Sequence, residues 1–355
     1  MLGLRLDGGY FYACGGCMEN RKSREVYIEL LRIICIFLVI YNHTRDYGYS
    51  LYQHASGADY WLSANLTVFC KIAVPIFFMI SGVTLLAKEE SLKDLYLKRV
   101  LRFVIVILLF TLLQYLRLYR VNPEGGFHIS TWLLYSYSGN IIEPYWYLKS
   151  YLAFLLILPF LRVLAKNMES RHFEYLIWLK IAETVISTIH MLTGYLMNVQ
   201  FPLGLNLIFY PLIGYYLAKK CQCKWKRSLC FLLAIVVTIV TVFGMTWFNV
   251  VRGEFNDGFL TNYTWLIAFA VFLGMRGLEI RDGWFMKVIL SFGPAVFGAY
   301  LIEDVIRNQF VFLFDSLPNQ VGSMTTAILF SLISTVVALI VARVMKWIPG
   351  LNKLI

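Results

Sequence analysis

Long apolar runs separated by short polar stretches make up most of this 355-residue chain. Many of the runs contain about 20 residues, the length that an α-helix needs to cross the hydrocarbon core of a bilayer. The pattern therefore predicts an all-α, polytopic integral membrane protein with about ten transmembrane helices. The predicted spans cover roughly Val26–His43, Ala64–Ala87, Val100–Leu118, Tyr145–Leu164, Tyr175–Met197, Leu203–Ala218, Leu229–Phe248, Leu260–Leu278, Met286–Ile306 and Thr325–Met345.

Basic residues between the predicted spans indicate how the chain is threaded through the membrane. Arg21, Lys22 and Arg24 precede the first span, and a basic loop follows the sixth span at residues 219–227. Because cytoplasmic loops carry an excess of Lys and Arg, these clusters place both termini in the cytoplasm. The main basic residues left on the outer side are Arg45, Arg117, Arg120, Arg252 and Arg307.

The composition agrees with a membrane protein and narrows its partners. Hydrophobic residues make up 59% of the chain and charged residues only 15%, and the mean hydropathy is +0.66. Soluble domains carry about 25% charged residues. The net charge of +11 lies in short clusters between spans, so it reflects orientation in the membrane and not a nucleic-acid partner. We expect a multi-pass protein of the plasma or inner membrane, in contact with the lipid bilayer.

The start of the chain differs from the rest in composition. Residues 1–22 are polar and Gly-rich and contain no apolar segment of the kind found in a secretory signal. We expect residues 1–22 to form a cytoplasmic leader, with 1–17 a candidate upstream extension because Met18 is a second plausible start, and residues 23–355 to form a single membrane domain. Cys14 and Cys17 have C-x-x-C spacing, but no second pair or nearby His completes a zinc site, so we expect no metal.

Two ionisable residues, Arg32 and His43, mark the edges of the apolar part of the first span. A charged side chain at the centre of a membrane helix costs roughly 2.5 to 3.5 kcal/mol, so ionisable residues in spans are functional candidates. Their separation of 11 residues is close to three helical turns, which puts both on one face with a rise of about 16 Å between them. A cation and a base on one helical face indicate a path for a substrate.

Two further patterns add candidate chemistry at the ends of this path. Arg99 and Arg102 are spaced i, i+3 at the cytoplasmic start of the third span, where two guanidinium groups on one face suit a phosphate group. Anchoring at the cytoplasmic interface is the alternative explanation for them. At the outer end, Asp46 follows His43 by three residues and is a candidate to orient the imidazole as a base. A structural role for a lone His at a helix end is the alternative.

Five segments, taken in order, resemble the motifs of membrane acyltransferase family 3, the O-antigen and nodulation-factor acetylase type of integral membrane O-acyltransferase. They cover nearly the whole chain from Ser23 onward. One departure concerns the last segment, because many family members have a His directly after Tyr-Leu-Ile, where this chain has Glu303. The segments are Arg32-x10-His43, the Val-Pro-x-Phe-Phe-x-x-Ser-Gly run at 74–82, Arg99-x-x-Arg102, Tyr145–Leu148 with Pro159, and Phe292–Gly293 with Phe297–Ile302.

The resemblance implies an enzyme that takes an acyl group, most often acetyl, from cytoplasmic acetyl-CoA and passes it to a glycan or lipid-linked saccharide on the outer side. It implies that Arg99 and Arg102 hold the CoA phosphates and that the pantetheine arm runs along the first span past Arg32. His43 would be the general base for the acceptor hydroxyl. No metal is required.

The acceptor side is less specified by the sequence. Trp146 and Tyr147 lie at the outer end of the fourth span, where their aromatic faces suit a sugar ring and where an interfacial aromatic belt is the alternative. We place Glu303 with them as a candidate for substrate binding. Two other functions fit part of the pattern: a transporter or flippase for a lipid-linked sugar or small anion, which needs no base at His43, and a membrane sensor or scaffold, which needs no acyl-CoA.

Overall fold

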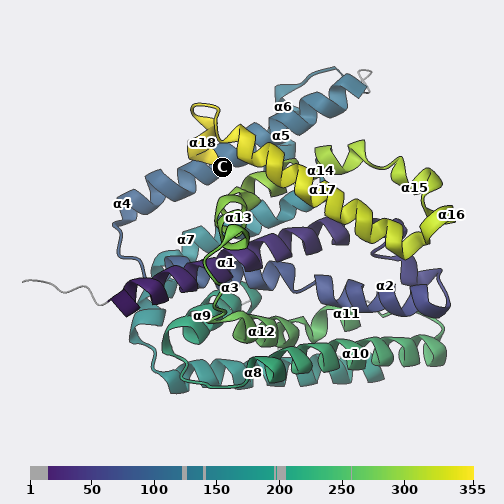
Figure 1. The fold of residues 1–355 in the computed structure, drawn as a ribbon, viewed down its shortest axis with the longest axis horizontal. Helices are drawn as coiled ribbons and strands as arrows, with labels where there is room; N and C mark the ends of the chain where they lie inside the picture. Colours follow the sequence, from purple (N-terminus) through teal and green to yellow (C-terminus); the bar gives the residue numbers. More distant parts are fainter. Residues whose placement is uncertain (1–14, 122–125, 139–140, 196, 198–204, 257) are drawn as a thin grey trace, which may run out of the picture.

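The computed structural model describes residues 15–355 apart from 122–125, 139–140, 196, 198–204 and 257 (Figure 1). Within this part of the chain the regular elements are helices, with no β-strand. Most of the helices run in roughly the same direction, along the long axis of the molecule (Figure 1).

Eight helical segments within the described residues are long and apolar enough to cross a membrane. This agrees with the prediction of an all-α polytopic membrane protein. Several segments combine two helices that follow each other directly in the chain. The eight are Gly57–Leu85, Leu92–Arg120, Glu143–Asn167, Ser170–Thr193, Arg227–Arg252, Gly258–Met275, Trp284–Gln309 and Ser323–Met345.

The helices that make up these segments have the following bounds. They are α2 (Gly57–Cys70), α3 (Ala73–Leu85), α4 (Leu92–Leu95), α5 (Leu101–Val121), α7 (Trp146–Asn167), α8 (Ser170–Thr193), α10 (Arg227–Arg252), α11 (Gly258–Asn262), α12 (Thr264–Met275), α13 (Trp284–Phe292), α14 (Val296–Gln309) and α17 (Ser323–Met345). Short helices lie between or after them: α6 (Ile129–Ser138), α15 (Leu313–Ser316), α16 (Pro318–Val321) and α18 (Leu351–Leu354).

The first and sixth predicted spans are the two that fall outside this set of eight. Helix α1 (Gly15–Asn42) is long enough, and it begins inside the predicted leader, but Glu25, Glu29 and Arg32 interrupt its apolar part. Helix α9 (Leu205–Tyr215) has only 11 residues, and residues 198–204 before it lie outside the described part. The difference from about ten spans therefore comes from charge in α1 and, at α9, from a helix that is described only from Leu205 onward.

Helix α1 lies at the centre of the bundle (Figure 1). It contacts α2, α3, α13, α14 and α17. Leu31, Cys35 and Ile36 are fully buried on it. Because neighbours surround α1, its charged residues Glu29 and Arg32 face protein and not lipid, which is the usual place for charge in a membrane domain.

Helices α2 and α3 belong to one span that breaks at Lys71. The cause is Pro75, which lies in the first turn of α3 and has no N–H to donate to the carbonyl of residue 71. The regular pattern of helical hydrogen bonds resumes one residue later, where Ile76 N donates to Ile72 O at 2.9 Å. The break leaves a lysine at the middle of an apolar segment.

Helix α3 packs on α9 with the two backbones in direct contact. A Cβ atom added to Gly82 would overlap the carbonyl of Pro211, and one added to Gly214 would overlap the carbonyl of Met79. Small residues allow this close approach, which is a common way to join helices in membranes.

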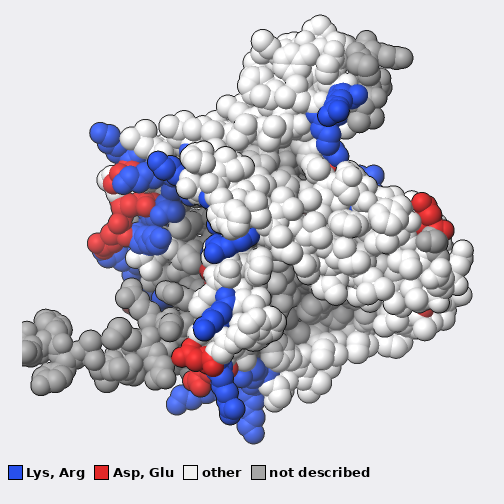
Figure 2. Space-filling view, turned by 45° about the horizontal axis from the view of Figure 1, so that its top comes forward, with Lys and Arg blue, Asp and Glu red and all other residues white. Residues whose placement is uncertain are grey.

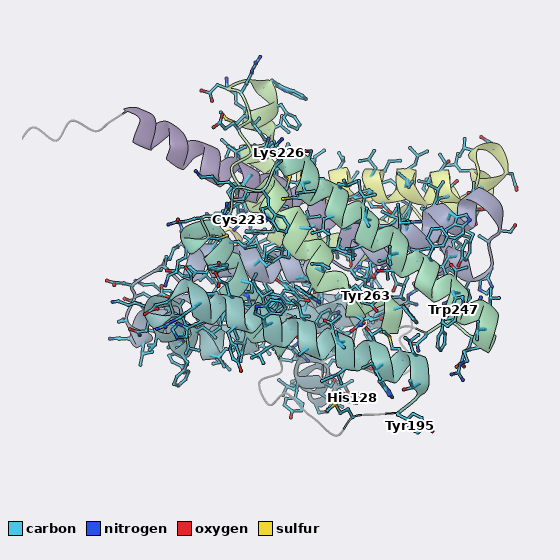
Figure 3. The ribbon with its side chains drawn as sticks, turned by 90° about the horizontal axis from the view of Figure 1, so that it is seen from below. His128, Tyr195, Cys223, Lys226, Trp247 and Tyr263 are labelled. Carbon is cyan, nitrogen blue, oxygen red and sulfur yellow. The ribbon has the colours of Figure 1, made fainter. Side chains whose placement is uncertain are left out.

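Helix α8 lies at the edge of the bundle and is joined to α11 and α12 by hydroxyl and indole groups. Thr188 Oγ1 lies 2.9 Å from the hydroxyl of Tyr263, and Trp265 Nε1 donates to Thr184 Oγ1 at 2.8 Å. In Figure 3 Tyr263 lies between α8 and α10, whereas the exposed Trp247 lies toward the end of α10. These residues do not line the cavity described below, so their contacts serve packing.

Charged side chains are concentrated at one end of the molecule. Figure 2 shows that Lys, Arg, Asp and Glu gather at the left end of the view, where α4 and α18 lie, and that few interrupt the middle of this face. A broad uncharged band flanked by charge is the pattern expected of a surface that faces hydrocarbon.

Candidate functional site

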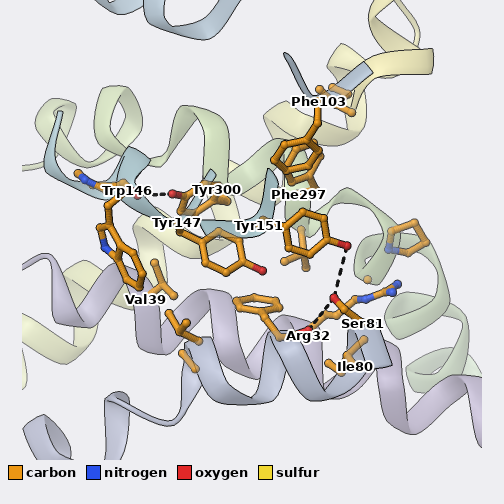
Figure 4. Close-up of a pocket in the computed structure, with 18 of the residues that line it drawn as sticks. Arg32, Val39, Ile80, Ser81, Phe103, Trp146, Tyr147, Tyr151, Phe297 and Tyr300 are labelled. Carbon is orange, nitrogen blue, oxygen red and sulfur yellow. Dashed lines mark hydrogen bonds between the residues drawn. The ribbon is translucent and has the colours of Figure 1, made fainter. Parts of the chain in front are cut away.

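A cavity of about 560 Å³ lies between α1, α3, α5, α7 and α14. Aromatic rings line its middle: Figure 4 shows Tyr147 and Tyr151 between Trp146 on one side and Ser81 and Arg32 on the other. The Tyr151 hydroxyl lies 3.4 Å from Ser81 Oγ. The cavity is therefore an elongated space with an apolar, aromatic middle.

The remaining rings support this middle part. Phe103 of α5 stacks on Tyr151 with ring centroids 4.9 Å apart and on Phe297 of α14 with centroids 5.4 Å apart. Tyr147 packs edge to face against Phe78 and Tyr300. Rings from four helices thus hold the cavity walls together, which limits the freedom of each side chain.

His43 lies on the cavity wall directly after the last residue of α1. Its backbone N–H still donates to the carbonyls of Val39 and Ile40, so the helical geometry extends to His43. Arg32 lines the same cavity. The sequence placed these two side chains on one face of one helix, and the structure brings both to one cavity.

The carboxylate that contacts His43 belongs to Glu303 of α14. Glu303 Oε1 lies 2.8 Å from His43 Nδ1, and the Glu303 side chain is only 1% exposed. A carboxylate this close to one ring nitrogen helps to orient the imidazole. Glu303 was predicted to bind substrate, but its contacts suit positioning of His43.

Asp46, predicted to orient His43, does not do so. The i, i+3 relation brings two side chains together only on one helix, and α1 ends at Asn42. Arg45 has a positive φ of 50°, which turns the chain away from the helix axis before Asp46 is reached. Asp46 is exposed as a result.

Arg307 connects the parts of the outer end of the site. It lies 3.3 Å from the second oxygen of Glu303, donates to Asp304 at 2.9 Å, and donates to the backbone carbonyl of His43 at 3.0 Å. The other oxygen of Asp304 accepts from Arg117 of α5 at 2.6 Å. Buried carboxylates need such partners, because an unpaired charge in this environment costs several kcal/mol.

The outer end of α7 is fixed to α14 by two tyrosines. Tyr145 donates to the carbonyl of Leu301 at 2.9 Å, and Tyr300 donates to the carbonyl of Pro144. These bonds hold the start of α7 against α14, the helix that carries Glu303. Trp146 and Tyr147, at the start of α7, both line the cavity. Trp146 remains 50% exposed, so it is accessible at the cavity rim.

Basic side chains line the other end of the cavity. Arg99 and Arg102, predicted from their spacing, are both present there together with Arg32. Sequence reasoning did not single out Lys98 and Lys346, which line the same end. Lys346 directly follows α17, so only the fold brings it next to the start of α5.

Arg99 is engaged by an acidic residue of the preceding loop. It contacts both oxygens of Glu90, at 2.8 Å from Nε and 3.0 Å from Nη2, and Arg162 of α7 contacts Glu90 at 2.9 Å. The hydrogen bonds from Arg99, assisted by Arg162, lower the pKa of the Glu90 carboxyl to about 2. Glu90 of the α3–α4 loop thus joins Arg99, just before α5, to Arg162 of α7.

Lys71 is a further cavity residue that sequence reasoning missed. It lines the cavity at the break between α2 and α3, and its Nζ lies 4.6 Å from the centroid of the Tyr49 ring. The signal was present in the sequence, because a lysine within an apolar span is costly and marks a functional candidate.

Three comparisons with known proteins bear on what this site does. A family model described as an acyltransferase domain, that of acyltransferase family 3, matches residues 25–345. No curated protein and no solved structure matches the chain. The matched residues include Arg32 and His43 of the cavity wall and Glu303, which contacts His43. It agrees with the resemblance of the five sequence segments, and the chain belongs to acyltransferase family 3.

Proposed function

We propose that the chain is a transmembrane O-acyltransferase that moves an acyl group, acetyl above all, from cytoplasmic acyl-CoA to a hydroxyl of a cell-surface glycan or lipid-linked saccharide. We assign it to the plasma or inner membrane. The supporting observation is one cavity with cations such as Arg102 at one end and His43, backed by Glu303, at the other. Family membership supplies the class of reaction.

The cavity suits an extended thioester donor. Its basic end offers charge to phosphate groups, which guanidinium and ammonium groups bind strongly. Its middle is lined by Phe77, Tyr147 and Tyr151, which suit the less polar pantetheine arm. A donor in this orientation presents its thioester toward the end of α1 that carries His43.

In the proposed reaction His43 acts as general base. With Nδ1 facing Glu303, Nε2 accepts the proton of the acceptor hydroxyl, and the oxygen attacks the thioester carbonyl carbon. A C–O bond forms, the C–S bond breaks, and the imidazolium returns the proton to the departing thiolate. The products are the acyl ester and free CoA. A positioned base of this kind contributes about 10²- to 10⁴-fold to the rate.

The acceptor side is the rim around Trp146. Trp146 lines the cavity and is half exposed, so one face of the indole can contact a sugar ring without displacing buried residues. Tyr147 lies deeper in the same wall. We propose that these two side chains orient the acceptor hydroxyl toward His43.

The proposal is tested by supplying membranes that contain the protein with acetyl-CoA labelled in the acetyl group. We expect label to appear in the glycan or lipid-linked saccharide fraction as a base-labile ester, with release of CoA thiol. The matched control is His43→Gln. Transport of a saccharide or anion without covalent label, equal in wild type and His43→Gln, would instead support a transporter.

A further inference from the structure

The basic residues at the inner end of the cavity differ in their partners. Three of the five contact carboxylates: Arg32 contacts Glu29 at 2.6 Å, Lys98 contacts Asp94 at 2.9 Å, and Arg99 contacts Glu90 at 2.8 Å. In each of these pairs the carboxylate offsets much of the positive charge of the guanidinium or ammonium group. A phosphate would have to compete with the carboxylate for it.

The other two basic residues, Arg102 and Lys346, contact backbone carbonyls. Arg102 Nε donates to the carbonyl of Leu354 at 3.2 Å, and Lys346 Nζ donates to the carbonyl of Pro294 at 2.7 Å. A carbonyl oxygen is neutral, so it satisfies a hydrogen bond without offsetting the charge. Both side chains line the cavity.

We propose that Arg102 and Lys346 together form the binding site for the phosphate groups of the acyl donor, and that Arg99 is a positioning residue. The inference rests on the proposed function and names the residues of its donor end. Arg102 comes from the start of α5 and Lys346 from the end of α17, so a phosphate group held between them would join the two helices.

The electrostatics of Lys346 agree with an anion site. Its pKa is lowered, first by burial and then by the nearby positive charges of Arg343, Arg102 and Arg32, against which only Glu29 acts in the opposite direction. A bound phosphate would offset the repulsion among these cations. Phosphate is the kind of ligand that charge-assisted hydrogen bonds from Arg and Lys hold most firmly.

Arg99 has a different part in this arrangement. Its bidentate contact with Glu90 holds the turn before α5 on the loop before α4, and Arg162 holds the same carboxylate on α7. Arg99 lies in the π-helical turn Tyr96–Val100, which leads directly into the start of α5, where Arg102 lies. Arg99 therefore acts on the donor through the placement of Arg102.

The test is direct binding of CoA and of pantetheine, which lacks the phosphates, to the purified full-length chain in detergent. We expect Lys346→Gln to weaken CoA binding about tenfold or more, the effect of losing one charge-assisted contact, and to leave pantetheine binding unchanged. Lys346→Arg should retain CoA binding. Lys353→Gln, on the exposed side of α18, is the matched control and should bind CoA as wild type does.

Each other outcome overturns a distinct claim. CoA binding within twofold of wild type in folded Lys346→Gln would overturn the role of Lys346 while leaving the proposed function intact. An equal loss for CoA and pantetheine would show a structural effect and overturn the phosphate site. Wild-type protein that binds no CoA at all would overturn the proposed function itself.

Discussion

Glu303 is a carboxylate in a place where charge is costly. With 1% of its side chain exposed, it depends on partners: His43 at one oxygen and Arg307 at the other. Arg307 also holds the backbone of His43, so the imidazole and its carboxylate are fixed as one unit. Such fixed geometry is what a general base needs to meet a substrate in the correct orientation.

We predict that Glu303→Gln lowers acyl transfer by about tenfold or more, because the amide keeps the shape of the side chain but no longer fixes the imidazole as a carboxylate does. The measurement is the transfer rate together with CoA affinity, which should stay at the wild-type value. Asp46→Asn, a change at the exposed acid, is the control and should transfer normally. An equal loss of acyl transfer in Glu303→Gln and Asp46→Asn would contradict the assignment of the orienting role to Glu303.

The pairing of His43 with Glu303 shows where sequence reasoning reached its limit. Arg32, His43, Arg99 and Arg102 were found because spacing along one helix and charge within a span are local signals. The contact between α1 and α14 joins residues far apart in the chain, and no local pattern reports it. Asp46 was chosen because it is the nearest acid in sequence, and the end of α1 removes it from the helix.

At the residue scale, Glu90 also gives a pH prediction. Its pKa is lowered from 4.5 to about 2 by Arg99 and Arg162, so its contribution to stability is present above its ordinary value and is lost as the pH falls toward 2. Glu90→Gln should therefore lower the melting temperature at pH 7. The gap between the two proteins should narrow below about pH 4.5. A gap that is the same at pH 7 and pH 3 would contradict this ion-pair account.

At the element scale, the packing of α3 on α9 depends on two glycines rather than on large apolar side chains. Gly82 and Gly214 let the two backbones touch. The sequence predicted both spans, but it did not predict that they meet at these positions. The break at Lys71 was equally hidden, although Pro75 supplies its cause.

We predict that Gly82→Ala destabilises the protein by about 1 to 3 kcal/mol, because the added methyl group overlaps the carbonyl of Pro211 and forces the helices apart. Thermal unfolding in detergent measures the effect as a lower melting temperature. Gly283→Ala is the control, because the nearest atom to its added Cβ is 3.8 Å away. Equal melting temperatures for both variants would show that the α3–α9 contact is looser than described.

At the scale of the whole molecule, the charge distribution and the cavity indicate the same orientation in the membrane. Charged residues gather at the end that holds α4 and α18 (Figure 2). The basic end of the cavity, with Arg102 and Lys346, lies at the start of α5 and the end of α17. By the excess of Lys and Arg expected at a cytoplasmic face, we propose that this end faces the cytoplasm, which holds the proposed acyl-CoA donor.

The side of the membrane that the donor end faces can therefore be measured. Sealed vesicles with the α4 end outward should transfer acetyl from added acetyl-CoA, whereas vesicles of the opposite orientation should do so only after they are made permeable. A protease-accessible tag on the α3–α4 loop reports the orientation of each preparation. If only the sealed vesicles of the opposite orientation transferred acetyl, the donor would enter from the other end, and the proposed direction of transfer would be wrong.

The general fold was predictable from the sequence because membrane helices are marked by length and apolarity. The number of spans was less predictable, since α1 carries charged residues within its apolar part. The cavity was predictable only in part: its two ends follow from helical spacing, but Lys346 reaches the cavity, and Glu303 reaches His43, through contacts among α1, α5, α14 and α17. Those contacts depend on how the helices pack, which the pattern along one helix does not specify.

The central claim is that one cavity joins a donor-binding end to a separate base at His43. It is tested most directly by measuring CoA affinity and acyl transfer in the same preparation of His43→Gln. We predict that the CoA dissociation constant stays within twofold of wild type while transfer falls by about 10²-fold or more. Transfer at the wild-type rate in His43→Gln would contradict the account.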